Sequence, residues 1–157
     1  TLFRSSAASD VYKRQDAVME RLSRNGVPLV PHIILGLHFG KMLGEWKALE
    51  MTAKYPLKLL VLVILMPLSG TKMEQVQPPP ADEIGAFFET ARKALPETEI
   101  MLGCARPLGG IKKEIDRLAI DAGLNGIAYP AEGTVAYARE HGLEPQIINA
   151  CCGVNWN

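Results

Sequence analysis

The stretch LLVLVILM, from Leu59 to Met66, is an unbroken run of apolar residues, three of which are β-branched. It is far too short to cross a bilayer, and Lys58 precedes it directly. A continuous apolar run of this length is typical of a strand that is covered on both faces, as in a parallel sheet. We therefore predict a central strand over residues 57–65, and the rest of the fold follows from its neighbours.

Segments with helical spacing alternate with apolar, β-branched segments on both sides of this strand. The spacing predicts further strands over residues 27–37, 99–105 and 125–130, and helices over residues 16–26, 44–56, 81–95, 111–123 and 133–142. Gly26 is expected to close the first of these helices, and Asp82 to cap the third. Such regular alternation with short connections predicts parallel strands joined by right-handed crossovers.

Two architectures fit this alternation: an open doubly wound sheet, and half of a (β/α)₈ barrel. A full barrel needs about 250 residues, whereas this chain has 157. We favour an α/β fold that is the C-terminal half of a (β/α)₈ TIM-type barrel, with about four βα units. Both architectures place the chemistry at the C-terminal ends of the strands.

The first fifteen residues, TLFRSSAASDVYKRQ, show neither helical nor strand periodicity. Reverse translation of Asp10 to Gln15 gives GATGTGTATAAGAGACAG, a transposase end used in sequencing libraries, and the preceding residues fit the adjoining primer and index bases. We therefore expect residues 1–15 to be a translated adapter rather than native sequence, the alternative being an ordinary disordered tail. Residues 16–157 would then be a partial barrel, with a cysteine-containing tail from about residue 143.

Charge and cysteine content restrict the class of protein. Seventeen basic residues balance seventeen acidic ones, which argues against a broad nucleic-acid or membrane-binding surface. Three cysteines, two of them adjacent, make a poor disulfide framework and suit metal or redox chemistry in a reducing compartment. We expect a cytoplasmic protein that acts on a small molecule or a carrier-bound group.

The segments expected at the strand ends carry the most specific signal. They are GLHFGKMLGE (36–45), MPLSGT (66–71), GCARPLGG (103–110) and AYPAEG (128–133). In this order and spacing they resemble the C-terminal half of radical S-adenosylmethionine enzymes of the biotin-synthase-related family. The closest resemblance is to members with GCARP and a C-terminal double cysteine, which are related to two-component lipoyl synthases.

The resemblance implies an S-adenosylmethionine pocket lined by the first two of these segments. Gly36, Gly40 and Gly44 would let the backbone approach a ligand closely. Glu45 would accept hydrogen bonds from a ribose hydroxyl or an ammonium group, the alternative being a solvated glutamate at a helix start. His38 would be a rim residue or, alternatively, a catalytic base.

The second segment would contribute Pro67, Ser69, Gly70 and Thr71. Backbone groups and hydroxyls there could recognise an adenine edge, and a purely structural turn is the equal alternative. His32 lies within the strand predicted over residues 27–37, where we expect a hydrogen-bonded core histidine.

Cys104 and Arg106 are two residues apart and would share one face if the strand continued through them. A half-buried cysteine beside a surface arginine is the simplest interpretation. The resemblance implies instead that both face an auxiliary iron–sulfur cluster, because biotin synthases carry a cluster-ligating arginine on this strand. Of Cys151 and Cys152, one would be a further ligand and the other a packing or redox partner, the alternative being a cysteine pair that holds no metal.

The resemblance also sets limits. The CxxxCxxC motif that holds the radical-generating [4Fe–4S] cluster is absent from the sequence, so this chain alone should not generate a radical. The parent enzyme would perform sulfur insertion, such as lipoyl formation, with the N-terminal half of the same barrel as a partner of this half. Two rivals remain: a phosphate-binding barrel enzyme that uses the glycine-rich ends after the last two strands, and a non-catalytic binding module.

Overall fold

A computed structural model describes residues 2–154 of the chain, with side chains described from Lys13 onward. Its centre is a four-stranded parallel sheet in the order β1-β2-β3-β4. The strands are β1 (His32–Leu35), β2 (Leu60–Ile64), β3 (Ile100–Leu102) and β4 (Gly126–Ile127). Each strand pairs in parallel with the next strand along the chain, as in the register His32↔Val61 between β1 and β2.

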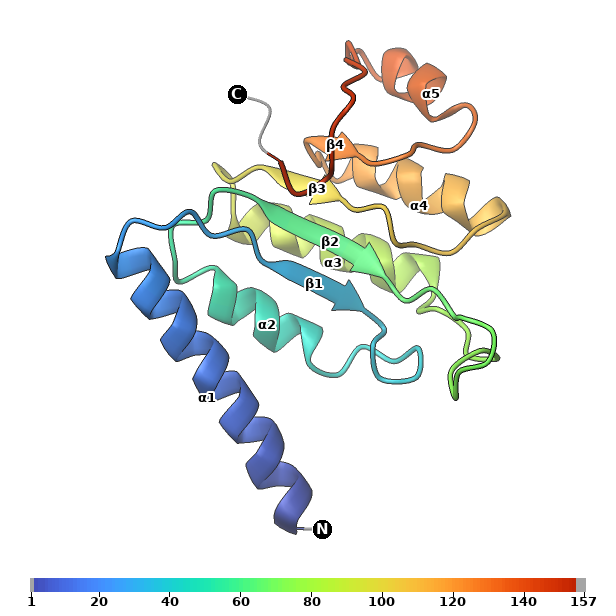
Figure 1. Ribbon diagram of the computed structural model, residues 1–157. Helices are drawn as coiled ribbons and strands as arrows, with labels where there is room; N and C mark the ends of the chain where they lie inside the picture. The colour runs from blue at the N-terminus through green and yellow to red at the C-terminus, as the bar shows by residue number, and fades with distance from the viewer. Residues whose placement is uncertain (1, 155–157) are drawn as a thin grey trace.

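A helix follows each strand. The helices within the described residues are α1 (Leu2–Arg24), α2 (Glu45–Thr52), α3 (Ala81–Ala94), α4 (Gly110–Asp121) and α5 (Thr134–Glu140). Figure 1 shows α3 behind β2, and side chains of α2, α3 and α4 share one core with the sheet. Helix α5 packs on α4. The predicted alternation of helices with parallel strands is confirmed.

The main core lies between the sheet and α2–α4, where side chains alternate along each strand. From the sheet it receives Ile33, Leu35, Leu60, Leu62, Ile64, Ile100 and Leu102, and from α3 it receives Ile84, Phe87, Phe88 and Ala91. All five residues of β2 are buried, which confirms the prediction of a strand covered on both faces.

The opposite face of the sheet carries a smaller apolar cluster, which we call the open-face cluster. It consists of Leu59, Val61, Val63 and Met101 together with Cys152 from the C-terminal segment. Figure 1 shows this segment, in dark red, returning across the front of β3, on the side away from α3. The two faces of the sheet are therefore covered by different kinds of structure.

Two local expectations differ from the structure. Residues 2–15 are helical and continue into the helix expected from Asp16, so that helix begins earlier than predicted and the alternative of a disordered tail is wrong. No glycine or proline occurs before Gly26, so nothing in the sequence interrupts the helix. Gly26 does close the helix: its φ is +68°, and the Val27 N–H donates to the Leu22 carbonyl over 3.0 Å. The adapter assignment itself stays a prediction.

The second error concerns the start of α3. Pro80 occupies the N-cap position of this helix, and no side chain caps it. Asp82 instead accepts a hydrogen bond from the backbone N–H of Glu83 within the first turn, over 2.9 Å. The carboxylate thus lies at the positive end of the helix without acting as the cap.

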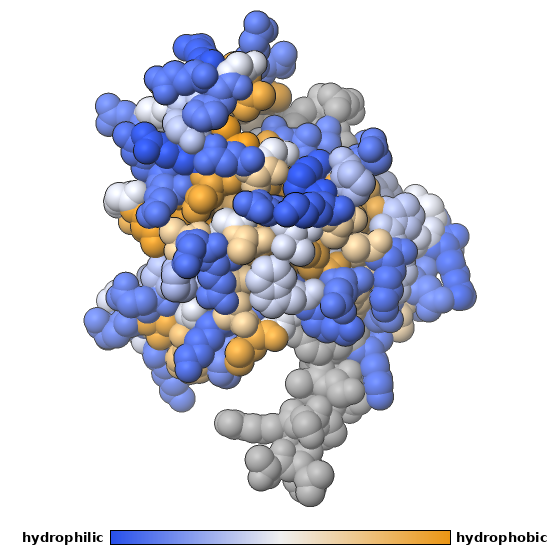
Figure 2. Space-filling view, turned by 180° about the vertical axis from the view of Figure 1, so that it is seen from behind, coloured by the Kyte–Doolittle hydropathy of each residue, from blue (hydrophilic) through white to orange (hydrophobic). Residues whose placement is uncertain are grey.

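The outer surface of the helical layer is mixed in character. Figure 2, which views the molecule from this side, shows charged and polar side chains with apolar patches between them. Within residues 2–154, none of the helices combines the length and apolar character that a membrane span requires.

Candidate functional site

The four segments that resemble the radical enzyme family follow the four strands. Because the strands are parallel, residues 36–44, 65–80, 103–109 and 128–133 all leave the sheet at one edge, which we call the carboxyl edge. Figure 1 shows the arrowheads of β1 and β2 pointing to this edge. It is the place where the fold brings the predicted residues together.

Glu45 closes the first of these segments into a compact turn. The side chain is buried, and its Oε1 accepts a hydrogen bond from the Gly36 N–H over 3.0 Å. Its Oε2 accepts a second bond from the Gly44 N–H over 2.9 Å. The solvated alternative for Glu45 is therefore wrong, and both carboxylate oxygens already bind the chain's own backbone.

Gly36 and Gly40 approach another part of the chain rather than open space. Both adopt left-handed conformations, with φ of +78° and +79°. A Cβ at Gly36 would lie 2.5 Å from the Pro79 ring, and a Cβ at Gly40 would lie 2.0 Å from the Gln77 carbonyl oxygen. The close approach expected toward a ligand is thus made toward residues 77–79, which the sequence pattern did not indicate.

His38 lies exposed at the tip of this turn. It forms a bridge with Lys41, and its ring meets that of Phe39 edge-on at 5.6 Å between centroids. Its assignment as a rim residue or as a catalytic base stays a prediction. Its imidazole is accessible from the carboxyl edge.

The turn from Pro67 to Thr71 is held mainly by its own hydrogen bonds. The Thr71 hydroxyl donates to the Leu68 carbonyl over 2.8 Å, and the Gly70 N–H donates to a Glu74 carboxylate oxygen over 2.7 Å. Ser69 and Gly70 are exposed. These bonds favour the structural turn, while Ser69 remains accessible at the edge.

Cys104 and Arg106 do not share a strand face. Strand β3 ends at Leu102, so both residues lie in the loop that follows it. Cys104 is exposed, whereas only 1% of Arg106 is. The expectation that the strand continues through residue 105 and points both side chains the same way is wrong, as is the alternative of a surface arginine.

Arg106 is instead the centre of a buried polar network. Its Nε donates to Asp116 Oδ1 over 2.9 Å. Its Nη1 donates to the Gly103 carbonyl over 2.7 Å, and its Nη2 to the Tyr129 carbonyl over 3.0 Å. All three nitrogens of the guanidinium thus have an acceptor, as burial of a charge requires.

Asp116 extends the network to the last unit of the fold. Its Oδ2 accepts from the Ala131 N–H over 2.7 Å and from the Thr134 hydroxyl over 3.1 Å. The pair therefore ties the loop after β3 to α4, to the loop after β4 and to the start of α5. Sequence reasoning missed Asp116, although an acidic residue beside Ile115 in an amphipathic helix was an available signal.

The three cysteines lie close together. Cys152 is buried in the open-face cluster, and this burial raises the pKa of its thiol. The pKa of the exposed Cys151 is lowered, first by a hydrogen bond from the Gly153 backbone and then by one from the Cys152 thiol. The Cys104 backbone contacts the Cys152 thiol. The fold thus brings together cysteines that are far apart in the sequence.

These residues do not fit the predicted auxiliary cluster as they are placed. Over the part of the chain whose side chains are described, no three His, Cys, Asp or Glu side chains converge on a point that could hold a metal ion. Arg106 is engaged by the buried Asp116 carboxylate and by two backbone carbonyls, so all three of its guanidinium nitrogens already donate within the chain. We therefore derive no chemistry through a cluster on this chain.

His32 departs from the core position predicted for it. It is exposed on the open face of the sheet, and its Nδ1 lies 3.2 Å from the Val30 carbonyl. A Cβ at Gly153 would lie 3.7 Å from the ring. The histidine thus borders the C-terminal segment rather than the interior.

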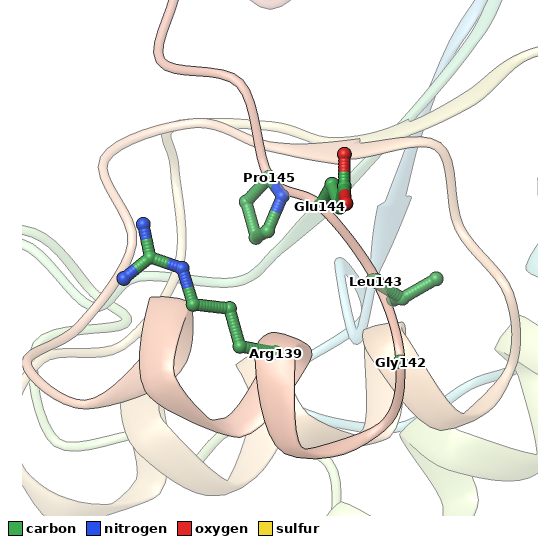
Figure 3. A pocket seen from close by; sticks show the side chains of 5 residues that line it. All are labelled: Arg139, Gly142, Leu143, Glu144 and Pro145. Carbon is green, nitrogen blue, oxygen red and sulfur yellow. The ribbon is translucent and has the colours of Figure 1, made fainter.

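The described surface includes a groove and a smaller hollow. A broad, mainly apolar groove of about 1020 Å³ runs along β1, between α1 and α2, and includes His32, His38 and Leu43 in its lining. A smaller hollow of about 520 Å³ lies at the end of α5, where Figure 3 shows the side chains of Arg139 and Glu144. Only the groove reaches the carboxyl edge.

Comparison of the chain with protein-family models, curated proteins and solved structures gives no match. The functional argument accordingly rests on the residues at the carboxyl edge and on the topology that gathers them.

Proposed function

We propose that the chain forms half of a (β/α)₈ barrel from a radical S-adenosylmethionine enzyme of the biotin-synthase-related type. The strand order supports the half-barrel part of this proposal, and the resemblance of the four strand-end segments supports the enzyme class. A doubly wound sheet reverses its strand order and places helices on both faces. Here the order is strictly sequential, and α2–α4 lie on one face. That arrangement is the one a (β/α)₈ barrel requires.

The open face supports the same proposal. In a barrel this face lines the interior, which is filled mainly by branched apolar side chains. Val61 and Val63 on β2 provide such branched side chains, and Met101 on β3 adds an unbranched apolar one. The C-terminal segment that carries Cys152 would lie against them inside the barrel. The carboxyl edge would then be one arc of the barrel mouth, where the substrate binds.

Within that arc, the residues of this chain would form one wall of the cofactor pocket. His38 and Ser69 are the accessible polar groups, and Glu45 acts as a positioning residue that fixes the turn carrying His38. S-adenosylmethionine, bound with an iron–sulfur cluster held outside this chain, would supply the radical. Sulfur insertion into a small or carrier-bound substrate, such as lipoyl formation, is the reaction proposed for the assembled barrel.

Binding of the cofactor tests the proposal directly. We would titrate ¹⁵N-labelled chain with S-adenosylmethionine and follow the backbone amides. Shifts are expected in residues 36–44 and 65–71, and His38→Ala should weaken them. His141→Ala is the matched control, because His141 is also exposed but lies at the end of α5. The absence of shifts in both segments would contradict the proposal.

One observation favours the phosphate-binding rival. Glycines precede both α4 and α5, and Lys113 Nζ lies 3.4 Å from the position of a Cβ at Gly133. A lysine side chain near the N-termini of two helices that begin at glycines could bind an anion. The rival predicts that inorganic phosphate shifts the amides of residues 109–113 and 131–134, while S-adenosylmethionine has no effect.

A further inference from the structure

The C-terminal segment is held on the open face mainly through one side chain. Cys152 is 6% exposed and packs with Leu59, Val61, Val63 and Met101. The residues around it in this segment are exposed or half-buried. Attachment of residues 143–154 to the sheet therefore depends strongly on Cys152.

The loop after β3 meets the segment at the same place. Ala105 packs against the open-face cluster, and the neighbouring Cys104 is exposed. The Cys152 thiol contacts the Cys104 backbone. The buried Cys152 thiol thus lies against the backbone of Cys104, whose own thiol is accessible, although α4, β4 and α5 separate the two residues in sequence.

From this juxtaposition we propose that Cys104 and Cys152 form an intrachain disulfide that tethers the C-terminal segment across the open face. This inference is independent of the function proposed above. It assigns a redox-controlled position to residues 143–154, with a low-molecular-weight disulfide such as glutathione disulfide as the oxidant.

The chemistry proceeds by two thiol–disulfide exchanges. The exposed Cys104 thiolate attacks one sulfur of glutathione disulfide, forms a mixed disulfide and releases one glutathione. Cys152 then loses its proton to solvent and attacks the Cys104 sulfur, which breaks the mixed disulfide and releases the second glutathione. Two protein thiols are oxidised, and one glutathione disulfide is reduced to two thiols.

Cys151 is a poor disulfide partner for Cys152, although the two thiols are hydrogen-bonded. It is exposed and does not belong to the open-face cluster that holds Cys152. Adjacent Cα atoms across a trans peptide are about 3.8 Å apart, shorter than the usual disulfide range of about 4.4–6.8 Å. The chain contains no cis peptide among its described residues, so a Cys151–Cys152 bridge would require distortion.

Mass spectrometry with matched variants tests the assignment. The fully reduced chain is incubated with glutathione disulfide, alkylated and digested with trypsin. We expect the peptide that contains Cys104 to be joined to the peptide that contains Cys151 and Cys152. Cys151→Ser should retain this link and Cys104→Ser should abolish it. Both substitutions are at exposed positions and should leave the fold intact.

Hydrogen exchange tests the tether itself. Amides of residues 143–154 should exchange at least about tenfold more slowly in the linked chain, because closing a long loop restricts opening of the segment. Dithiothreitol should restore the faster exchange. Loss of the link in Cys151→Ser, a link only between two copies of the chain, or unchanged exchange in the linked protein would each overturn the proposal.

Discussion

The guanidinium of Arg106 and the carboxylate of Asp116 form an ion pair in which neither side chain is exposed to solvent. The pair joins residues that lie ten positions apart, one in the loop after β3 and one on the inner side of α4. Together with the carbonyls and N–H groups that it binds, it fixes the last strand-end loops of the sheet relative to each other.

Breaking this pair should be costly. Arg106→Met leaves the Asp116 carboxylate buried without its cation, and should lower the free energy of unfolding by about 3–5 kcal/mol. Arg106→Lys should recover only part of this loss, because an ammonium cannot bind three divergent acceptors as a guanidinium does. Urea denaturation followed by circular dichroism measures the effect.

The exposed pair Lys47–Glu50 is the control for that experiment. Its side chains are largely solvated, so Lys47→Met should change stability by less than about 1 kcal/mol. Equal losses for Arg106→Met and Lys47→Met would mean that the buried network does not hold the loops together.

Gly40→Ala and Gly70→Ala separate steric contact from backbone strain. Both glycines have a φ of +79°, yet a Cβ at Gly70 meets nothing within 4 Å, whereas one at Gly40 meets the Gln77 carbonyl. Gly70→Ala should lower the free energy of unfolding by about 1 kcal/mol, because alanine is strained in the left-handed conformation. Gly40→Ala should cost at least about 1–2 kcal/mol more, with amide shifts in residues 76–79. Similar costs and no such shifts would contradict the contact.

Glu45→Ala should loosen the turn that carries His38. Removal of the carboxylate leaves the Gly36 N–H without its acceptor, which should cost about 1–3 kcal/mol. Glu45→Gln keeps one oxygen as an acceptor but places its NH₂ group against the other backbone N–H. We therefore expect a loss of stability smaller than that of Glu45→Ala. Hydrogen exchange at Gly36 and Gly44 reports the change, and Glu50→Ala on the exposed side of α2 should leave both amides unaffected.

Tyr55 links α1 to the end of α2 in a pH-dependent way. Its hydroxyl donates to Asp16 Oδ1 over 2.7 Å, and this bond raises the pKa of Tyr55 to about 12. The hydrogen bond requires the neutral phenol. It therefore stabilises the folded chain fully at pH values below the ordinary tyrosine pKa of about 10, and this stabilisation is lost as the pH rises through about 12. Phenolate absorbance should show this late titration in the native chain.

Asp16→Asn should move the Tyr55 titration back toward its ordinary range, and Tyr55→Phe should remove it. Tyr137 is an internal reference, because its pKa is raised by a separate hydrogen bond to Asp121. A titration near 12 that persists in Tyr55→Phe would assign the signal to another tyrosine.

The edge of β1 should promote self-association. The strand pairs with β2 on one side, and within the described residues no strand covers its other side. Exposed edges of parallel sheets invite pairing with other chains. We expect concentration-dependent association of the chain at micromolar concentration. Ile34→Lys, which places a charge on this strand, should reduce it, whereas Leu68→Lys in the loop after β2 should not. Sedimentation velocity distinguishes these outcomes.

The order and type of the elements could be predicted because they depend on local periodicity. The run from Leu59 to Met66 and the spacing in residues 81–95 carry their own signals, and β2 and α3 appear where these signals place them. The helical state of residues 2–15 was missed because polar residues without an apolar stripe give little periodicity, although they contain no helix breaker.

The candidate site was less predictable because its contacts are between segments. Nothing near Gly40 indicates that its partner is the Gln77 carbonyl, in a loop with no periodic pattern. Likewise, the spacing of Cys104 and Arg106 suggests a shared face only if β3 is long, and it ends at Leu102. Once the backbone leaves the strand, the nearest buried carboxylate decides where the arginine points, and that carboxylate is on α4.

The pairing of each strand with the next has a consequence for how the molecule is made. Every sheet contact joins segments that leave the ribosome one after another, so β1 and β2 can pair, with α2 packed on them, before α4 has been synthesised. The Arg106–Asp116 network and Cys152 lie C-terminal to this first unit, so their contacts form after it. We therefore expect folding to proceed by the successive addition of strand–helix units, with the three cysteines meeting only after residue 152 has been synthesised.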